Sequence, residues 1–486
     1  MDTPHPTARA GGVVGILAFA GIVAAITQTL VVPLIAELPK ILGTSSSNAS
    51  WVITATLLAA AVATPVAGRL GDMFGKRRML IASLAPLVAG SVVCALSSSV
   101  VPMIVGRGLQ GLGMGVVPLG ISLLRDVVPA EKLGSSIAVM SASMGVGGAL
   151  GLPFAAAIAE NSSWRVLFWV VAALSLAVAV LIRFLVPVDA KSGASQGFDV
   201  LGAIGLGIAL VCLLLGVSKG ADWGWGSGTT LGLLAAAVVV LLVWGRWELR
   251  VEDPLVDLRV TARPQVLLTN AASILIGFSM YAQSLVVPQL FQLPEATGYG
   301  LGQSMLAMGL WMAPSGLMMM AMSPVGAKVS AAKGPKVTLA VGALIISLGY
   351  GLAVPMIDGG STWSLLAVTL VCNTGVGFAY GAMPALIMGA VPQSETASAN
   401  SFNTLMRSIG SSLAAAVIGV VMAQMTTDFG GHALTTAGGF RAAMLIGCVV
   451  ALAAAALAVL IPVRSPAQKD PLATAPTAPE VTTAKV

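Results

Sequence analysis

Charged residues are scarce in this chain, and one short stretch concentrates them. Residues 68–78 hold four cations and one acid, Asp72, between two long apolar runs, although only 9% of the chain is charged. An anion near a helix end can be held by unpaired N–H groups, and cations can tie it across neighbouring helix ends. Such contacts break and re-form without covalent chemistry, so they predict a conformational latch with these members: Gly68, Arg69, Gly71, Asp72, Gly75, Lys76 and Arg77. The alternative is a solvated basic loop, which explains the cations but neither Asp72 nor the three glycines.

A second charged group lies inside an apolar run. Arg107 falls within the predicted helix 101–124, where a charge costs at least about 2.5 kcal/mol at the bilayer centre, so a cavity or a partner must receive it. Gln110 lies one turn along the same helix face. The pair predicts a charge relay, and the alternative is a structural arginine bonded to helix-end carbonyls. No acid lies in the central part of any predicted helix; the nearest are Glu37 and Glu160.

The composition places most of the chain in lipid. Hydrophobic residues make up 57% of the 486, and the mean hydropathy is +0.94. A soluble domain could not cover so much apolar surface with so few charges. A helix needs about 20 apolar residues to cross the hydrocarbon core. The apolar runs predict fourteen such helices: 12–36, 50–70, 78–97, 101–124, 134–159, 164–186, 199–218, 229–247, 265–288, 301–323, 336–355, 362–390, 399–424 and 440–463.

Basic residues predict the orientation of these helices. With both termini in the cytoplasm, 19 of the 25 Lys and Arg residues fall in the tails and the even-numbered loops, as the positive-inside rule requires. Residues 326–336 form a degenerate copy of 68–78, with Ala331 in place of Asp72, which predicts two homologous halves. The predicted organisation is a cytoplasmic N-terminus (1–11), an N-terminal six-helix half (12–186), two inserted linker helices (199–247), a C-terminal six-helix half (265–463) and a disordered cytoplasmic tail (464–486).

Five ordered motifs resemble those of the major facilitator superfamily, in its branch of fourteen-helix drug:proton antiporters. Residues 68–75 match the signature Gly-x-Leu-x-Asp-x-x-Gly, and residues 107–111 match Arg-x-x-Gln-Gly. Weaker matches lie at 164–168, 198–202 and 254–258. The resemblance covers residues 50 to 410 approximately. It implies an all-α polytopic membrane protein with two six-helix bundles plus two inserted helices, and a role for the arginine of the second motif in proton transfer.

The first helix departs from the pattern of that family. The family shows Leu-Asp-x-Thr-Ile-Val with its acid inside the membrane, whereas Thr27 occupies the acid's position here. A proton-coupled carrier needs a group that titrates, and threonine does not supply one. We therefore expect Glu37 or Glu160 to carry protons beside Arg107 and Gln110. Otherwise the coupling is weak, absent or different.

Two further sets of residues follow from the resemblance and from helix patterning. In the fifth helix, residues 145–153 partly match an antiporter motif and predict a hinge at Gly147, Gly151 and Pro153, with a plain packing face as the alternative. A substrate cavity is expected at mid-membrane between the halves. Its candidate lining residues are Gln28, Gln283, Tyr281, Trp311, Asn373, Tyr380, Asn403 and Arg407. For each of these, helix packing is the alternative. A cavity with Arg407 and no acid suits neutral, anionic or amphipathic molecules better than cations.

The sequence lacks the residues that other classes of function require. The sequence has no phosphate-binding Gly-x-x-x-x-Gly-Lys-Ser/Thr loop and no clustered metal ligands, so we expect no enzyme, no metal and no cofactor. The net charge of +6 indicates topology rather than nucleic-acid binding. The sequence predicts a monomeric exporter of amphipathic or drug-like molecules in the cell membrane, driven by a proton gradient. The alternatives are a dedicated exporter of one endogenous metabolite or lipid, and a transporter-like protein with weak or no proton coupling.

Overall fold

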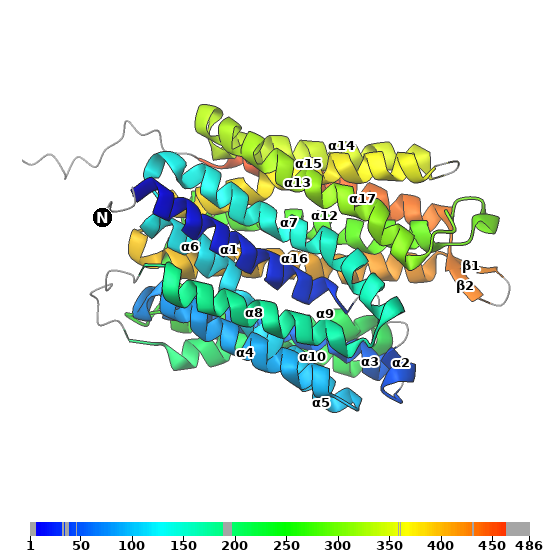
Figure 1. The fold of residues 1–486 in the computed structure, drawn as a ribbon, viewed down its shortest axis with the longest axis horizontal. Coiled ribbons are helices and arrows are strands. Elements are labelled where there is room, and N and C mark those ends of the chain that lie inside the picture. Colours follow the sequence, from blue (N-terminus) through cyan, green and yellow to red (C-terminus); the bar gives the residue numbers. More distant parts are fainter. Residues whose placement is uncertain are drawn as a thin grey trace, which may run out of the picture.

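The structure is a computed structural model, and it describes residues 6–31, 34, 38–44, 46–187, 197–357, 359, 361–429 and 432–462. Within these residues, fourteen helices are long and apolar enough to cross a membrane, which confirms the predicted number. They lie side by side along the long axis of the molecule (Figure 1). The chain is therefore a multi-pass membrane protein. The predicted C-terminal tail, 464–486, and the first residues of the predicted N-terminus lie outside the described residues.

The helices fall into three consecutive groups. The first is α1 (Pro6–Thr29), α2 (Leu38–Ile41), α3 (Ser46–Phe74), α4 (Lys76–Leu96), α5 (Val100–Leu112), η2 (Gly113–Gly115), α6 (Val116–Val127), α7 (Ala130–Asn161) and α8 (Arg165–Leu185). The second is the pair α9 (Val200–Trp223) and α10 (Gly228–Glu248). The third is α11 (Leu258–Thr261), α12 (Pro264–Gln292), η3 (Glu295–Thr297), α13 (Met305–Lys333), α14 (Pro335–Met356), α15 (Thr362–Met388), η4 (Gln393–Glu395), α16 (Thr396–Gln424) and α17 (Ala437–Leu460). A short antiparallel hairpin, β1 (Thr426–Phe429) and β2 (His432–Thr435), follows α16 and was not predicted.

Several helix boundaries differ from the predicted ones. The first helix ends at Thr29, within the predicted span 12–36. The fourth predicted span is divided into α5, η2 and α6. Its glycines approach neighbouring helices so closely that a Cβ at Gly113 would lie 2.8 Å from the carbonyl oxygen of Ser83 in α4. A side chain at this position would separate the two helices.

The first and third groups of helices each have an apolar core. One core gathers residues of α1 to α8, including Leu17, Leu84 and Phe168, and the other gathers residues of α12 to α17, including Ile276 and Phe440. The two groups, hereafter the N-terminal and C-terminal halves, meet where α7 packs on α13 and where α3 packs on α16. The halves also meet where α15 packs on α7 and where α16 packs on α6.

The inserted pair covers the line where α3 meets α16. Leu206 and Leu210 of α9 share an apolar cluster with Ala61 of α3 and Leu405 of α16, and α10 packs on the other side of α9. Asp199 begins α9 by accepting a hydrogen bond from the backbone N–H of Gly202, as an N-cap residue does. The inserted pair thus contacts both halves at once.

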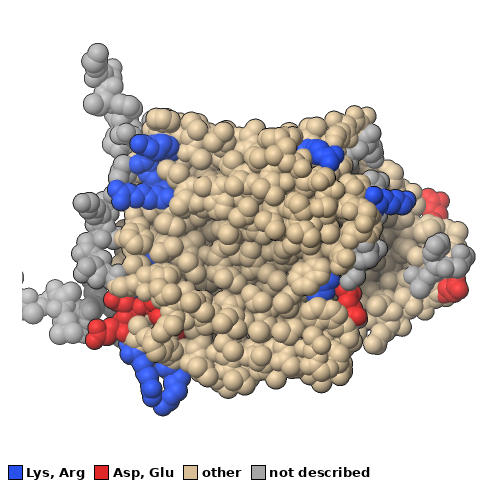
Figure 2. All heavy atoms as spheres, turned by 90° about the horizontal axis from the view of Figure 1, so that it is seen from below, with Lys and Arg blue, Asp and Glu red and all other residues tan. Residues whose placement is uncertain are grey.

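The predicted internal repeat is visible in the backbone. Gly75 separates α3 from α4 with φ 97° and ψ 132°, and Gly334 separates α13 from α14 with φ 87° and ψ 153°. Residues other than glycine rarely adopt such angles. Both turns lie at the end of the molecule where α1 begins, which we call the basic end. On the face seen in Figure 2, charged atoms gather toward the two ends and leave an uncharged band between them.

Candidate functional site

Asp72 lies at the basic end, in the last turn of α3, and reaches across to the other half. Its carboxylate accepts hydrogen bonds from the backbone N–H groups of Ala397 (3.0 Å) and Ser398 (2.8 Å), the first residues of α16. The first N–H groups of a helix have no partner within it, and the helix dipole favours an anion there. Asp72 therefore fastens the N-terminal half to the beginning of α16.

Two glycines of the predicted latch allow this approach. A Cβ at Gly68 would overlap the side chain of Ser401 and would lie 2.7 Å from the carbonyl oxygen of Ala397, both in α16. A Cβ at Gly71 would overlap the side chain of Leu119 in α6. A larger residue at Gly68 would push α3 away from α16 and lengthen the bonds to Asp72, whereas one at Gly71 would displace Leu119 within the N-terminal half.

The cations of the latch have partners other than Asp72, which differs from the prediction that they tie it directly. Arg69 lies 3.7 Å from the carboxylate of Asp253, in the segment after α10. Lys76 contacts Asp126 at the end of α6 (2.6 Å). Arg77 donates to backbone carbonyls at the end of α8. The cations instead hold the surrounding helix ends, because each lies closer to another acceptor than to the carboxylate bound by α16.

Further contacts between the halves at the basic end were not predicted. The carboxylate of Asp126, already bound to Lys76, also accepts a hydrogen bond from Gln393 of η4 (3.0 Å). Arg125 donates to the hydroxyl of Thr396 (3.1 Å) and to a nearby carbonyl. A signal was present, since the adjacent pair Arg125-Asp126 ends a predicted helix on the same side of the membrane as residues 68–78.

Arg107 is enclosed within the N-terminal half and only 2% exposed. Its Nη1 donates to the carbonyl oxygen of Thr27 (2.9 Å) and to Oε1 of Gln110 (2.6 Å), and its Nε donates to the carbonyl oxygen of Val52 (3.2 Å). Gln110 in turn donates to Ser91 (2.8 Å). Among the residues that the structure describes, no carboxylate lies within ion-pair distance of Arg107. Within this part of the chain, carbonyl oxygens from three helices hold the guanidinium.

The acids predicted to act with Arg107 cannot be placed beside it. Glu37 lies outside the described residues, and Glu160 belongs to the last turn of α7 with its side chain outside them as well. The hydroxyl of Thr27 donates to the carbonyl of Val23 in its own helix (2.7 Å), so it is turned away from the guanidinium. The predicted charge relay through Glu37 or Glu160 stays a prediction.

The small residues of α7 serve two neighbours. Gly147 and Gly151 face α1, where a Cβ on either would overlap atoms between Ile22 and Thr29. Gly145 faces Met319 of α13, and Pro153 lies against Gly309 of the same helix. The helix runs unbroken from Ala130 to Asn161. This arrangement explains the small residues as packing faces, and the hinge at 147, 151 and 153 stays a prediction.

A narrow pocket lies between the two halves. Its lining comes from α6, α7, α15 and α16: Val117, Ile121, Ser141, Met144, Tyr380, Pro384, Asn400, Asn403, Thr404 and Arg407. In this structure it leaves room for no more than about one water molecule, far less than the roughly 300–1,000 Å³ that drug-sized ligands occupy. A larger occupant therefore requires the halves to separate. The lining includes three predicted residues, Tyr380, Asn403 and Arg407.

The other predicted cavity residues lie elsewhere. Gln28 contacts Met114 within the N-terminal half, and Asn373 donates to the carbonyl of Thr369 in its own helix. Trp311 stacks edge-on against Trp363, with ring centroids 4.9 Å apart. Tyr281 and Gln283 belong to α12 and are absent from the pocket lining. The missed lining residues Asn400 and Thr404 share one face of α16 with Asn403 and Arg407, and their spacing of three and four residues was the signal.

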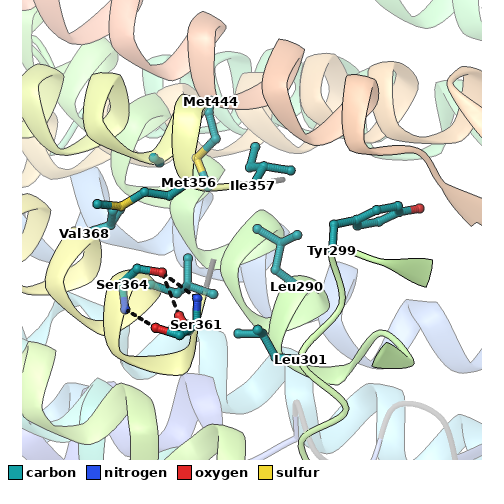
Figure 3. Close-up of a pocket in the computed structure, with 11 residues that line it drawn as sticks. Leu290, Tyr299, Leu301, Met356, Ile357, Ser361, Ser364, Val368 and Met444 are labelled. Carbon is teal, nitrogen blue, oxygen red and sulfur yellow. Dashed lines mark hydrogen bonds between the residues drawn. The ribbon is translucent and has the colours of Figure 1, made fainter. Parts of the chain in front are cut away.

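A second pocket lies within the C-terminal half at the end opposite the basic end (Figure 3). Its side chains are mainly apolar, and its two serines, Ser361 and Ser364, bond to each other as a capping box at the start of α15. The hydroxyl of Tyr299 donates to the carbonyl of Thr435 (2.7 Å), and burial raises the pKa of Tyr299. Because these polar groups already hydrogen-bond within the protein, this pocket offers a ligand few hydrogen-bonding partners.

Comparison with known proteins agrees with this geometry. The family model of the Major Facilitator Superfamily matches residues 17–415. The chain belongs to this superfamily. An uncharacterized MFS-type transporter of Mycobacterium tuberculosis is 29% identical over 448 residues, which cover 89% of this chain but 64% of that protein. This superfamily member thus spans less than two thirds of the length of that relative.

Two other relatives of this superfamily member are named for a function. The tetracenomycin C resistance and export protein of Streptomyces glaucescens is 30% identical over 79% of this chain and 70% of its own length. Multidrug resistance protein 3 of Bacillus subtilis is 25% identical over 84% of this chain and 78% of its own length. The crystal structure of the human organic anion transporter MFSD10 matches with a TM-score of 0.66 and 15% identity, covering 94% of this chain and all of that one. That structure supports the fold.

Proposed function

We propose that this superfamily member exports small amphipathic or drug-like molecules by alternating access. The observation that carries the proposal is the closed contact at the basic end, where Asp72 of one half binds the first N–H groups of α16 in the other. A small set of charge-assisted hydrogen bonds can separate and re-form as the halves rock. The pocket between the halves lies beside these contacts. The names of the Streptomyces and Bacillus relatives, an export protein and a multidrug resistance protein, support the direction of transport.

We further propose where the exporter resides and which gradient drives it. The exporter resides in the cell membrane as a monomer with both termini in the cytoplasm, which the distribution of basic residues supports. Transport is driven by a proton gradient, and Arg107 with Gln110 forms part of the relay, with Glu37 or Glu160 as the titrating group. The alternative is a dedicated exporter of one endogenous metabolite or lipid. A further alternative is weak or absent proton coupling, which Thr27 in the usual acid's position favours.

The test combines survival with transport. An efflux-deficient host expressing the chain is exposed to a toxicity panel, and uptake into everted vesicles is measured with and without a proton gradient. Broad protection with gradient-dependent uptake supports the proposal, protection against one compound supports the dedicated exporter, and no accumulation overturns export. Asp72→Asn should slow transport several-fold, while Asp253→Asn, which alters a longer and more exposed ion pair, should have little effect. An unchanged rate in both variants would remove the latch from the mechanism.

A further inference from the structure

Arg407 is a buried cation without a matching anion. It is 7% exposed, in the middle of α16. Its guanidinium makes one long hydrogen bond, from Nη2 to the hydroxyl of Thr404 (3.4 Å), and its Cζ lies 4.6 Å from the centre of the Tyr380 ring. Among the described residues, no carboxylate lies within ion-pair distance. In that part of the chain, its protein partners are thus one hydroxyl and the Tyr380 side chain, fewer than its five N–H donors can serve.

The position of Arg407 shows where an acceptor could come from. The side chain belongs to the lining of the pocket between the halves, and that lining includes no acid. A buried charge without a partner is unfavourable, and the cost is recovered when an anion binds next to it in surroundings of low dielectric constant. A ligand can reach the guanidinium from this pocket, because Arg407 is part of its lining.

The other lining residues indicate which chemical groups the rest of such a ligand should carry. Val117, Ile121, Met144 and Pro384 are apolar, and the Tyr380 ring offers a flat surface beside the guanidinium. Oδ1 of Asn400 is buried without a donor, so it can accept a hydrogen bond from a hydroxyl or amide of the ligand. Behind the pocket, Nδ2 of Asn270 is likewise buried without a partner, although its Oδ1 accepts from Asn403 (2.8 Å).

We propose that the pocket between the halves, once it widens as the halves separate, is an anion site that selects amphipathic organic acids, with the guanidinium of Arg407 binding their carboxylate or phenolate. This proposal rests on the proposed export function and names its substrate class. The guanidinium supplies paired donors to the anionic group, the apolar residues of α6, α7 and α15 contact the body of the molecule, and Asn400 accepts from a polar substituent. An organic cation of the same shape is excluded, since its charge would lie against that of Arg407.

The binding test uses three probes of one shape: 2-naphthoate, 2-naphthamide and 2-naphthylmethylammonium. Binding to the purified full chain is measured by isothermal titration calorimetry in phosphatidylcholine nanodiscs, which lack anionic lipid. We expect 2-naphthoate to bind most tightly and Arg407→Gln to weaken it by roughly tenfold or more, as the loss of a charge-assisted contact does. Binding of 2-naphthamide should change by less than about twofold. Arg407→Lys should retain part of the preference, and Arg246→Gln, an exposed arginine of α10, should leave binding unchanged.

Other results would overturn the anion site. These are equal binding of the three probes, tighter binding of the ammonium, or an Arg407→Gln effect equal for all three probes. Loss of 2-naphthoate binding when phosphatidylglycerol is added would assign the site to an anionic lipid headgroup and overturn the substrate assignment. A thermal-unfolding midpoint for each variant excludes misfolding as the cause.

Transport separates the two proposals. If 2-naphthoate binds through Arg407 but no probe accumulates in vesicles, the anion site stands and export fails. If vesicles accumulate 2-naphthamide or the ammonium as fast as 2-naphthoate, in both wild type and Arg407→Gln, export stands and the anion site fails.

Discussion

Two buried arginines lie away from the ends of the membrane spans, one in each half, and their surroundings differ. Arg107 donates to three oxygens at 2.6–3.2 Å, contributed by α1, α3 and its own helix. Arg407 has one long bond to Thr404 and an aromatic ring beside it. Both side chains are buried. Burial alone therefore does not distinguish a cation whose donors have acceptors within the protein from one that lacks them, and the count of acceptors does.

The difference also separates the tasks of the two halves. Carbonyl dipoles hold the charge of Arg107 in a fixed place among tightly packed helices. The charge of Arg407 faces the pocket, where its partner can change as the halves move. The following variants test this contrast, beginning with the largest expected effect.

Replacing the enclosed arginine should cost the most stability. Arg107→Met removes three hydrogen bonds to a charged group, so we expect the free energy of unfolding to fall by about 3 kcal/mol or more. Arg407→Met should lower it by less than about 1 kcal/mol or raise it, because a buried charge without a partner is removed. Unfolding by SDS titration of purified protein measures both. Equal losses in the two variants would erase the contrast.

The close approach that encloses Arg107 can be disturbed without touching its side chain. In α5, a Cβ at Gly111 would overlap the carbonyl of Thr56 in α3, whereas a Cβ at Gly108 would meet nothing within 4 Å. Gly111→Ala should therefore destabilise by about 1–3 kcal/mol through overpacking. Gly108→Ala, its matched control, should be neutral or stabilising by up to about 1 kcal/mol through better helix propensity. The same titration decides, and a stable Gly111→Ala protein would mean that α5 and α3 can separate freely.

Gln110 tests how much of the enclosure depends on one acceptor. Gln110→Leu removes the shortest of the bonds to Arg107 and the bond to Ser91, and we expect a loss of about 1.5 kcal/mol in stability. Gln28→Leu, at an exposed glutamine of α1, should change stability by less than about 0.5 kcal/mol. Similar midpoints for the two variants in thermal unfolding would show that carbonyls suffice for Arg107.

The smallest expected effect concerns the ring beside Arg407. Tyr380→Leu removes a cation–π contact of about 0.5–1 kcal/mol and leaves the charge in place. The affinity for 2-naphthoate should fall by about two- to fivefold, and that for 2-naphthylmethylammonium should not rise. Tyr380→Phe keeps the ring and should retain most of the affinity. A larger loss for Tyr380→Leu than for Arg407→Gln would make the aromatic surface, and not the charge, the main determinant of binding.

The features that sequence reasoning predicted well are those with a local cause. Fourteen helices follow from apolar length, and the buried Arg107 follows from the cost of a charge within such a run. Gly75 and Gly334 were aligned by the repeat, and both adopt the rare backbone that this alignment implies. Each of these signals is contained within one short stretch of residues.

The features that escaped prediction depend on distant or backbone partners. Asp72 meets backbone N–H groups 325 and 326 residues away, and such donors leave no mark on residue type. Polar residues inside spans were equally ambiguous, because Asn373 is satisfied by a carbonyl of its own helix. Asn403 and Arg407 differ from Asn373 because other polar residues lie three or four positions away on the same face of α16. Only the four polar residues together indicate that this face lines a pocket.

The place of α9 has a consequence for molecules dissolved in the bilayer. Leu206 and Leu210 cover the line where α3 meets α16, with α10 outside them. A hydrophobic compound diffusing within the lipid leaflets cannot enter laterally there unless α9 moves aside. Lateral entry from the membrane on this side therefore depends on movement of α9, a helix that belongs to neither half.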